Sequence, residues 1–296
     1  MSVITHRFIT TLFSLILLCG ALPAVQAETV RLGVLAPRGE LKAQTRWDEL
    51  VNYLEQETGH QIKLVPLPPP QVFNAAQQKQ VDLVLSHSPH TVQLEEKLGA
   101  TVMATLNKKD GPRFGGVIIA RKDSGIKTAE DLRGKNVMSL KFRAAAGAYI
   151  FQTYHLMSRG IDPHKDFGNL REGKKQDDLV LAVNNGLIDA AFVRTGLLEA
   201  MDKEGKIAID DFQIVDQQIS SDFSLARTTA LYPEWCLSAL PAVDQETTNR
   251  FKGAVIKLAP EHNAARSAGI RGFVEPVSLD EIKQALKFLK ISPYSA

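Results

Sequence analysis

Cysteine is scarce in this sequence, and its scarcity limits how the chain can be stabilised. The 296 residues include two cysteines, Cys19 and Cys236. Cys19 lies in an N-terminal apolar stretch that we expect to be removed, so the mature chain would keep Cys236 alone and form no internal disulfide. Stability must then come from packing, even in an oxidising compartment. Because Cys236 stands between Trp235 and Leu237, we interpret it as a buried structural residue rather than a catalytic thiol.

A strong charge imbalance is also missing. Lysine and arginine together number 35 against 33 acidic residues, which gives a formal net charge of +2. No basic tail or stripe is present, and this argues against a nucleic-acid partner. The sequence also lacks a G-x-S-x-G motif, an H-E-x-x-H motif and a glycine-rich phosphate loop. We therefore predict a protein that is not an enzyme, with no catalytic residues, no cofactor and no metal site.

Only the N-terminus carries a long apolar run. Residues 8–22 are apolar, they follow His6 and Arg7, and residues 25–27 form a small-x-small cleavage pattern. This arrangement predicts a secretory signal peptide over residues 1–27, and a mature protein in the periplasm. A lipoprotein signal with an acylated Cys19 is the alternative. Leu18 stands where that signal needs a small residue, so we favour cleavage after Ala27.

Short apolar segments alternate with helical patterns along the mature chain. This alternation predicts βαβ units and a mostly parallel sheet. The expected strands are 29–36, 61–67, 81–85, 101–106, 116–121, 136–140, 188–193 and 212–215. The expected helices are the segment from Trp47 to Leu54, 72–78, a helix ending at Leu98, a short helix over 128–134, 149–158, 197–203, one capped by Asp244, and one that begins with a capping box at 278–281.

Two strand-to-helix junctions between residues 136 and 201 dominate the functional interpretation. In each, a short apolar strand is followed by an expected helix, which leaves backbone N–H groups unpaired at the helix start. These groups and the helix dipole favour an anion. Two such junctions in one parallel sheet would lie side by side at its carboxyl edge, where open α/β sheets bind ligands. The sequence therefore predicts one wall of a small-anion site.

Five segments occur in the order found in a known family. They are LVLSHSPH (83–90), SGIKTAEDLRGK (124–135), GIDP (160–163), VRT (193–195) and LYPEW (231–235). Together they resemble the phosphate/phosphite/phosphonate-type solute-binding proteins of ABC transporters, and they are also similar to the periplasmic part of tetrathionate-type sensor kinases. The resemblance covers nearly all of the mature chain.

The resemblance implies an α/β protein with the type II periplasmic-binding-protein fold, in which two α/β lobes enclose a ligand cleft and two crossover strands form the hinge. We expect lobe one to comprise residues 28–114 plus 229–296, and lobe two residues 115–228. The family's ligand-binding positions map onto the following residues of this chain: Ser86, His87, Ser88, Phe142, Arg143, Ala144, Arg194, Thr195 and Tyr232.

This chain departs from the family pattern at some of these positions. Phosphonate binders usually present hydroxyl-bearing residues at the helix start in lobe two, whereas here Arg143 is followed by three alanines. Hydroxyl donors are lost and a guanidinium is gained. Gly196 stands where an acidic residue is common. An anion remains the favoured ligand class.

Each of these residues also has an ordinary structural interpretation. Arg143 can be a solvated residue in a first helical turn, although a cation there opposes the helix dipole. Arg194 can pair with Asp189 or Glu199. His87 and its neighbour at position 90 can be capping or core residues, and no third metal ligand is evident beside them. Tyr232 and Trp235 suit packing as well as ligand contact.

The resemblance implies a periplasmic solute-binding protein that captures a small oxyanion for an ABC transporter. The anion would be like a phosphonate, phosphite or phosphate, or an oxyanion of sulfur. The alternative is a soluble sensory or accessory protein that signals ligand occupancy to a membrane histidine kinase. In both cases the expected partners are a small anionic ligand and an inner-membrane permease or kinase, and we expect a monomer.

Overall fold

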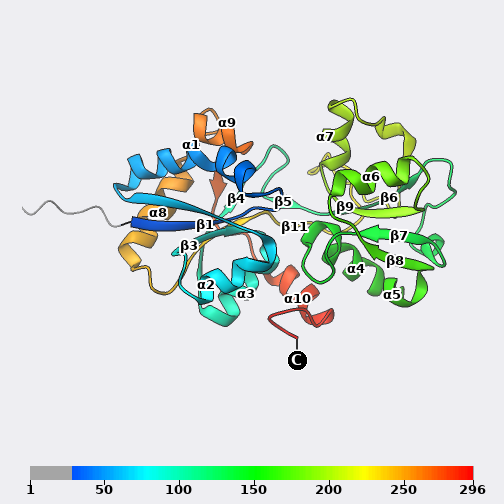
Figure 1. Ribbon diagram of the computed structural model, residues 1–296, viewed down its shortest axis with the longest axis horizontal. Helices are drawn as coiled ribbons and strands as arrows, with labels where there is room; N and C mark the ends of the chain where they lie inside the picture. The colour runs from blue at the N-terminus through cyan, green and yellow to red at the C-terminus, as the bar shows by residue number, and fades with distance from the viewer. Residues whose placement is uncertain (1–28, 296) are drawn as a thin grey trace, which may run out of the picture.

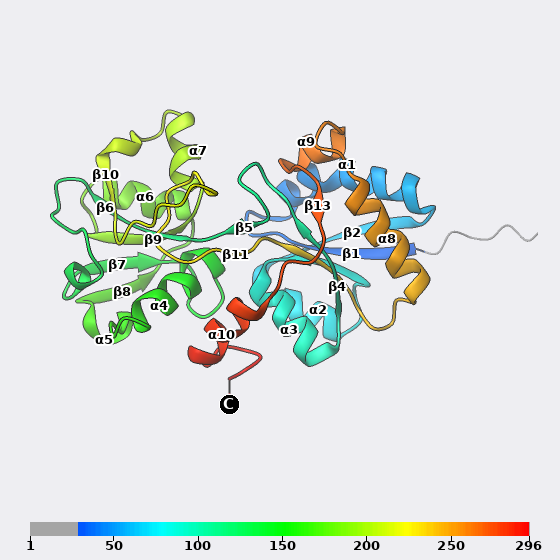
Figure 2. The same ribbon diagram turned by 180° about the vertical axis from the view of Figure 1, so that it is seen from behind.

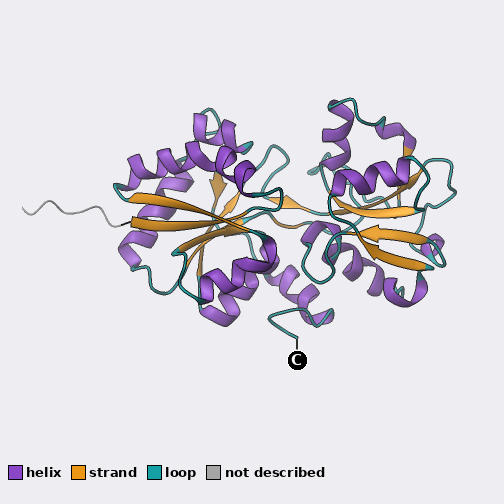
Figure 3. Cartoon of the chain, viewed as in Figure 1, coloured by secondary structure: helices purple, strands orange, loops and turns teal. Residues whose placement is uncertain are grey.

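The computed structural model describes residues 29–295, and they form two large β-sheets with helices on both faces and a two-stranded sheet that connects them (Figure 1, Figure 3). The predicted signal peptide, with Cys19, lies outside the described residues. Between residues 29 and 295 no helix combines the length and apolar character needed to cross a membrane.

The first sheet has six strands in the order β13-β4-β12-β3-β1-β2. Strands β1, β2 and β3 are parallel neighbours, whereas β12 runs antiparallel between β3 and β4. The sheet is therefore mixed, because the chain inserts β12 in the opposite direction after returning from the second sheet. The bounds are β1 Thr29–Leu35, β2 Gln61–Leu67, β3 Leu83–Ser86, β4 Thr101–Leu106, β12 Cys236–Ala239 and β13 Phe273–Val274.

Alternating side chains give this sheet two separate apolar faces. In β3, Leu83 and Leu85 join the core beneath α1, α8 and α9, while Val84 joins the core beneath α2 and α3. Figure 1 shows α1 and α9 on the opposite side of the sheet from α2 and α3. The bounds are α1 Glu40–Thr58, α2 Val72–Gln77, α3 Ser88–Leu98, α8 Gln245–Lys257 and α9 Asn263–Ala268, with a 3₁₀ turn at Pro69–Gln71.

The second sheet has five strands in the order β10-β6-β9-β7-β8. Strands β7, β8 and β9 are parallel, and β6 pairs antiparallel with both β9 and β10. The bounds are β6 Gly116–Arg121, β7 Asn136–Ser139, β8 Asn169–Glu172, β9 Ala190–Arg194 and β10 Phe212–Ile214; α4 Ile150–Met157, α5 Pro163–Asp166, α6 Gln176–Asn184 and α7 Leu197–Lys203; and 3₁₀ turns Glu130–Leu132, Ala146–Ala148 and Ile209–Asp211.

Two short strands join the sheets. β5 (Arg113–Phe114) pairs antiparallel with β11 (Tyr232–Pro233), and Figure 2 shows both crossing between the lobes. The last helix, α10 (Asp280–Phe288), packs beside this connection: Glu281 binds Arg113 at 2.8 Å, and the Phe288 ring meets Tyr154 of α4 at a centroid distance of 5.4 Å. This arrangement confirms the predicted fold of two α/β lobes joined by two strands. The division after residues 114 and 228 stays a prediction.

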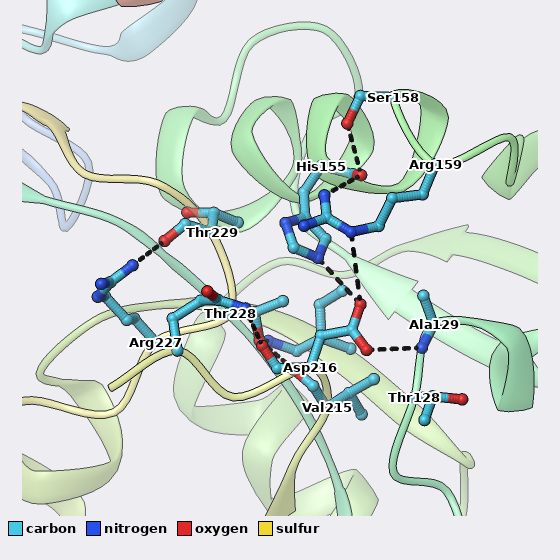
Figure 4. A network of polar contacts seen from close by, with 12 residues as sticks. Thr128, Ala129, His155, Ser158, Arg159, Val215, Asp216, Arg227, Thr228 and Thr229 are labelled. Carbon is cyan, nitrogen blue, oxygen red and sulfur yellow. Dashed lines mark hydrogen bonds and ion pairs between the residues drawn. The ribbon is translucent and has the colours of Figure 1, made fainter. Parts of the chain in front are cut away.

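The segment that returns from β10 toward the first lobe is fixed by Asp216 (Figure 4). Its carboxylate accepts the backbone N–H of Ala129 at 3.1 Å and lies 3.1 Å from Nε2 of His155, with Nε of Arg159 at 4.0 Å. Burial lowers the pKa of His155, and the interaction with Asp216 opposes that lowering. Asp216 therefore ties the return segment to α4.

Thr228 continues this attachment further along the same segment (Figure 4). Its hydroxyl accepts the N–H of Ile118 at 2.9 Å and donates to the carbonyl of Val215 at 2.7 Å. Its own N–H donates to the carbonyl of Gly116 at 2.9 Å. These bonds hold the return segment along β6, so the crossover starts from a fixed position.

Two helix starts differ from the prediction. The helix expected over 128–134 is a single 3₁₀ turn, because the Asp131 carboxylate accepts the N–H groups of Lys127 and Thr128 and closes a tight turn. The capping box at 278–281 is also wrong. The hydroxyl of Ser278 accepts the N–H of Asp280, and Glu281 turns away to bind Arg113. By contrast, Asp244 caps α8 as predicted, through a 2.8 Å bond from the N–H of Thr247.

Candidate functional site

The carboxyl ends of β7 and β9 lie side by side, as the sequence predicts. The two strands are parallel neighbours, with Met138 opposite Ala191, and Arg194 is the last residue of β9. In the first lobe, β3 ends at Ser86, one residue before the N-cap of α3. Predicted site residues from both lobes thus lie at the carboxyl ends of their strands, where an α/β protein binds ligands.

The wall from the first lobe is a buried polar turn. The side chains of Ser86 and Ser88 are fully buried, and the Ser88 hydroxyl has no hydrogen-bond partner. The Ser86 hydroxyl lies 2.8 Å from Nδ1 of His90, and His87 caps α3 by accepting the N–H of His90 at 3.4 Å. The rings of His87 and His90 stack with centroids 4.0 Å apart. In residues 29–295 no group of three or more possible ligands is arranged to hold a metal ion.

Burial keeps these two histidines neutral. Desolvation lowers the pKa of His87 to about 4 and that of His90 well below its usual value, and the adjacent His87 lowers it further. In the unfolded chain both imidazoles titrate near a pH of about 6.5. Above that pH the two histidines are unprotonated in both the folded and the unfolded chain, and they do not reduce the free energy of unfolding. Between there and about pH 4 only the unfolded chain takes up protons, so stability falls as the pH falls.

We therefore expect the free energy of unfolding to fall by roughly 3 kcal/mol from His87 alone as the pH drops from about 6.5 to about 4. Denaturant unfolding at a series of pH values measures the slope. The double variant His87→Gln/His90→Gln should have a flatter slope than the wild type. Equal slopes in the wild type and the double variant would contradict this account.

The predicted turn of the second lobe has a different backbone from the one expected. The expectation that a helix starts at Phe142–Ala144 is wrong: a 3₁₀ turn occupies Ala146–Ala148, and α4 begins at Ile150. The backbone N–H of Phe142 donates to Oε1 of Glu172 in β8 at 2.8 Å. That N–H group is therefore engaged within the protein in this conformation.

Arg143 reaches from the second lobe to the C-terminal segment. Its φ of +61° is the left-handed conformation, and its Nη2 donates to the carbonyl of Lys290. The side chain lines a cavity of about 210 Å³. Other lining residues are Ala144 from the same turn and Asn74, His90, Gln93 and Ser292. The cavity therefore brings Arg143 and Ala144 together with the polar turn of the first lobe, and its volume is below the roughly 300–1,000 Å³ typical of drug-sized ligands.

Arg194 and Thr195 lie at the end of β9. The backbone N–H and hydroxyl of Thr195 both engage Gly115, with the N–H donating to its carbonyl at 3.1 Å and the hydroxyl accepting its N–H at 3.2 Å. Thr195 is thus occupied in holding β9 to the crossover. Arg194 is exposed and donates to the carbonyl of Thr195 at 3.1 Å. Within residues 29–295 no carboxylate forms an ion pair with it, neither Asp189 nor Glu199.

Tyr232 is separate from these groups. Its ring stacks on Phe151 with centroids 4.0 Å apart, and the residue is 2% exposed. Burial raises the pKa of its phenol. In this conformation Tyr232 packs the crossover against α4 and offers almost no surface to a ligand.

Sequence reasoning missed three charged residues near Arg194. They are Arg46 in α1, Lys108 in the loop after β4 and Glu234 directly after β11. Both Arg46 and Lys108 experience the positive charge of Arg194 and the negative charge of Glu234. The LYPEW segment could have drawn attention to Glu234. Nothing in the local sequence, however, indicates that Glu234 lies near Arg46 of α1 and Lys108 of the loop after β4.

The family profile described as "ABC transporter, phosphonate, periplasmic substrate-binding protein" matches residues 32–280. The chain belongs to this family. Among solved structures, it resembles PhnD1 of Prochlorococcus marinus in complex with methylphosphonate, at 16% identity and a TM-score of 0.72 over 89% of this chain and 98% of that one. A binding protein of a phosphonate ABC transporter from Pseudomonas aeruginosa gives 17% identity and a TM-score of 0.69 over 88% of this chain and 86% of that one. Both likenesses support the fold.

This chain is also similar to a sensor histidine kinase. The chain is 32% identical to the tetrathionate sensor histidine kinase TtrS of Salmonella typhimurium over 295 residues, which is 98% of this chain and 48% of that protein. The chain spans about half the length of the curated relatives it matches.

Proposed function

We propose that this protein is a periplasmic solute-binding protein that captures a small oxyanion between its lobes and delivers it to an ABC permease. Membership of a family of substrate-binding proteins supports binding rather than catalysis. The observation that supports an anionic ligand is the pair of arginines Arg143 and Arg194. Both come from the second lobe, and within residues 29–295 neither forms an ion pair with a carboxylate.

Unpaired guanidinium groups suit an oxyanion because they donate two parallel N–H bonds to a phosphonate, phosphate or sulfonate group. The backbone N–H groups of Phe142 and Thr195 are already bonded. The proposal therefore places the anion's charge against arginine side chains rather than against helix N-termini. The small cavity beside Arg143 supports a ligand of few atoms.

A screen by thermal unfolding tests the proposal. At a hundred times its dissociation constant, an anion that binds the native state should stabilise it by roughly 2.7 kcal/mol, a rise in Tm of several degrees. The anions are phosphate, phosphite, methylphosphonate, sulfate, thiosulfate and tetrathionate. Arg143→Ala and Arg194→Ala should each weaken the response, and Arg250→Ala on α8 serves as the distant control.

Two outcomes of this screen would contradict the proposal at different levels. If an anion stabilises the wild type, Arg143→Ala and Arg194→Ala equally, the two arginines do not contact it. If only neutral or cationic solutes stabilise the protein, the ligand is not an oxyanion.

The similarity to TtrS favours a second candidate, in which the protein reports anion occupancy to a membrane histidine kinase. Cells that lack the protein separate the two. Loss of uptake of the stabilising anion supports transport. Unchanged uptake with loss of the transcriptional response to that anion supports sensing.

A further inference from the structure

Three cationic side chains from the two lobes, Lys108, Arg46 and Arg194, interact electrostatically with one buried carboxylate. Glu234 is 2% exposed, and its Oε1 lies 2.6 Å from Nζ of Lys108. The backbone N–H of Trp235 donates to its Oε2 at 3.3 Å. Glu234 thus forms its ion pair with Lys108. The other two cations are Arg46 and Arg194, and Arg38 adds positive charge near Arg194.

Arg46 is held in place by groups that carry no negative charge. Its guanidinium lies over the ring of Trp47 at 4.4 Å and over that of Trp235 at 5.5 Å. Its Nε donates to the carbonyl of Ala268 at 2.9 Å. These contacts fix the direction of the side chain, but none of them neutralises it.

The cations repel one another across the cleft. Burial lowers the pKa of Arg46 to about 10; Glu234 opposes this change and Arg194 adds to it. The pKa of Lys108 is likewise lowered by burial, with Arg194 and Arg46 adding to the effect. Arg194 is open to water yet has protein on several sides, so desolvation lowers its pKa, and Arg38 lowers it further.

Acidic groups on the second lobe are engaged elsewhere. Asp177 and Glu199 both act on Arg194 from a distance. Asp177 pairs with Lys206 at 3.6 Å, and Glu199 accepts the N–H of Ala226 at 2.8 Å. Within the described residues the cluster therefore has more positive than negative charge.

We infer that the site selects anions that carry two negative charges, with Arg194 contacting the ligand from one lobe and Arg46 and Lys108 from the other. This inference rests on the proposed function, since it names the charge class of the same ligand. A dianion offsets the excess charge that Glu234 leaves, whereas a monoanion leaves the cations repelling one another. Contacts from both lobes also mean that the ligand favours the form in which the lobes are close.

Pairs of related anions with different charge test the inference. One pair is sulfate and methanesulfonate, which are both tetrahedral. The other is ethane-1,2-disulfonate and ethanesulfonate, which are both elongated. Their charges do not change near neutral pH, so calorimetric titration of the full chain compares a dianion with a monoanion of fixed charge. We expect the dianion of at least one pair to bind about tenfold tighter than its monoanion or more.

The variants are Arg194→Gln and Lys108→Met, with Arg250→Gln as the control that should keep the preference. Loss of most of the preference in the first two supports the inference. Equal binding of dianion and monoanion, or an unchanged preference in both cleft variants, overturns it while the oxyanion function stands. If none of the four probes binds and the wider anion screen also gives no stabilisation, the proposed function fails as well.

Discussion

Substitution of Glu234 by glutamine is expected to destabilise the ligand-free protein by roughly 3 kcal/mol, the low end for a broken buried ion pair. The carboxylate is almost fully buried, and Lys108 approaches it at 2.6 Å. Without it, Lys108 loses its counter-ion while Arg46 and Arg194 still repel it. The partial exposure of Lys108 limits the loss, because water solvates part of the freed charge.

The same substitution is expected to strengthen anion binding. The negative charge of Glu234 would repel a bound anion. Glutamine has nearly the same shape as glutamate but no charge. We expect the preferred anion to bind about tenfold tighter, in line with removal of a like charge from a partly buried site. Denaturant unfolding measures the first effect, and calorimetric titration measures the second.

Glu281→Gln is the matched control for this pair of measurements. Glu281 also pairs with an arginine near the crossover, but it is exposed, so the change in stability should stay within about 1 kcal/mol. A Glu234→Gln variant with wild-type stability would contradict the assignment of a buried ion pair. A variant that is destabilised but binds anions more weakly would place Glu234 in contact with a ligand's donor group.

A second large effect is expected at Gln152. This fully buried side chain of α4 donates from Nε2 to the carbonyls of Gly147 at 2.9 Å, Val193 at 2.9 Å and Val117 at 3.2 Å. It thereby joins the turn after β7 to β9 and β6. Gln152→Leu keeps the volume but removes the two N–H donors that the three carbonyls share, at about 1 kcal/mol each, or roughly 2 kcal/mol in total.

The corresponding fall in Tm is roughly 6 °C for a protein of this size. Anion binding should weaken too, because the turn that carries Arg143 and the strand end that carries Arg194 lose their common support. Gln213→Leu is the control, since Gln213 makes a single bond, to the carbonyl of Ile214 at 2.9 Å. If the two variants lose equal stability, Gln152 does not act as a three-way support.

The sequence predicts the parts of this fold that depend on local pattern. Alternating or continuous apolar segments identify strands such as β2, whose bounds match the prediction. Asp244 caps α8 because the acceptor and the N–H it binds lie three residues apart. The juxtaposition of the ends of β7 and β9 was also predicted, from two short apolar strands that belong to one parallel sheet.

Features that depend on residues far apart in the chain were beyond prediction. The turn at Phe142 is not helical, since Arg143 has a φ of +61°, and Glu172, thirty positions later, accepts the N–H of Phe142. The cationic cluster joins a helix, a loop and two strand ends that come together only in the folded chain. Ligand contact by the predicted site residues from Ser86 to Tyr232 stays a prediction.

The central claim is that an oxyanion binds between the lobes against arginine side chains, and crystals grown with selenate test it most directly. Selenate is a tetrahedral dianion, and its selenium atom gives an anomalous signal that fixes its position. We predict an anomalous peak between the lobes, within hydrogen-bond distance of the guanidinium of Arg194 or Arg143. Peaks confined to the outer surface, at a selenate concentration that raises the Tm, would contradict the claim.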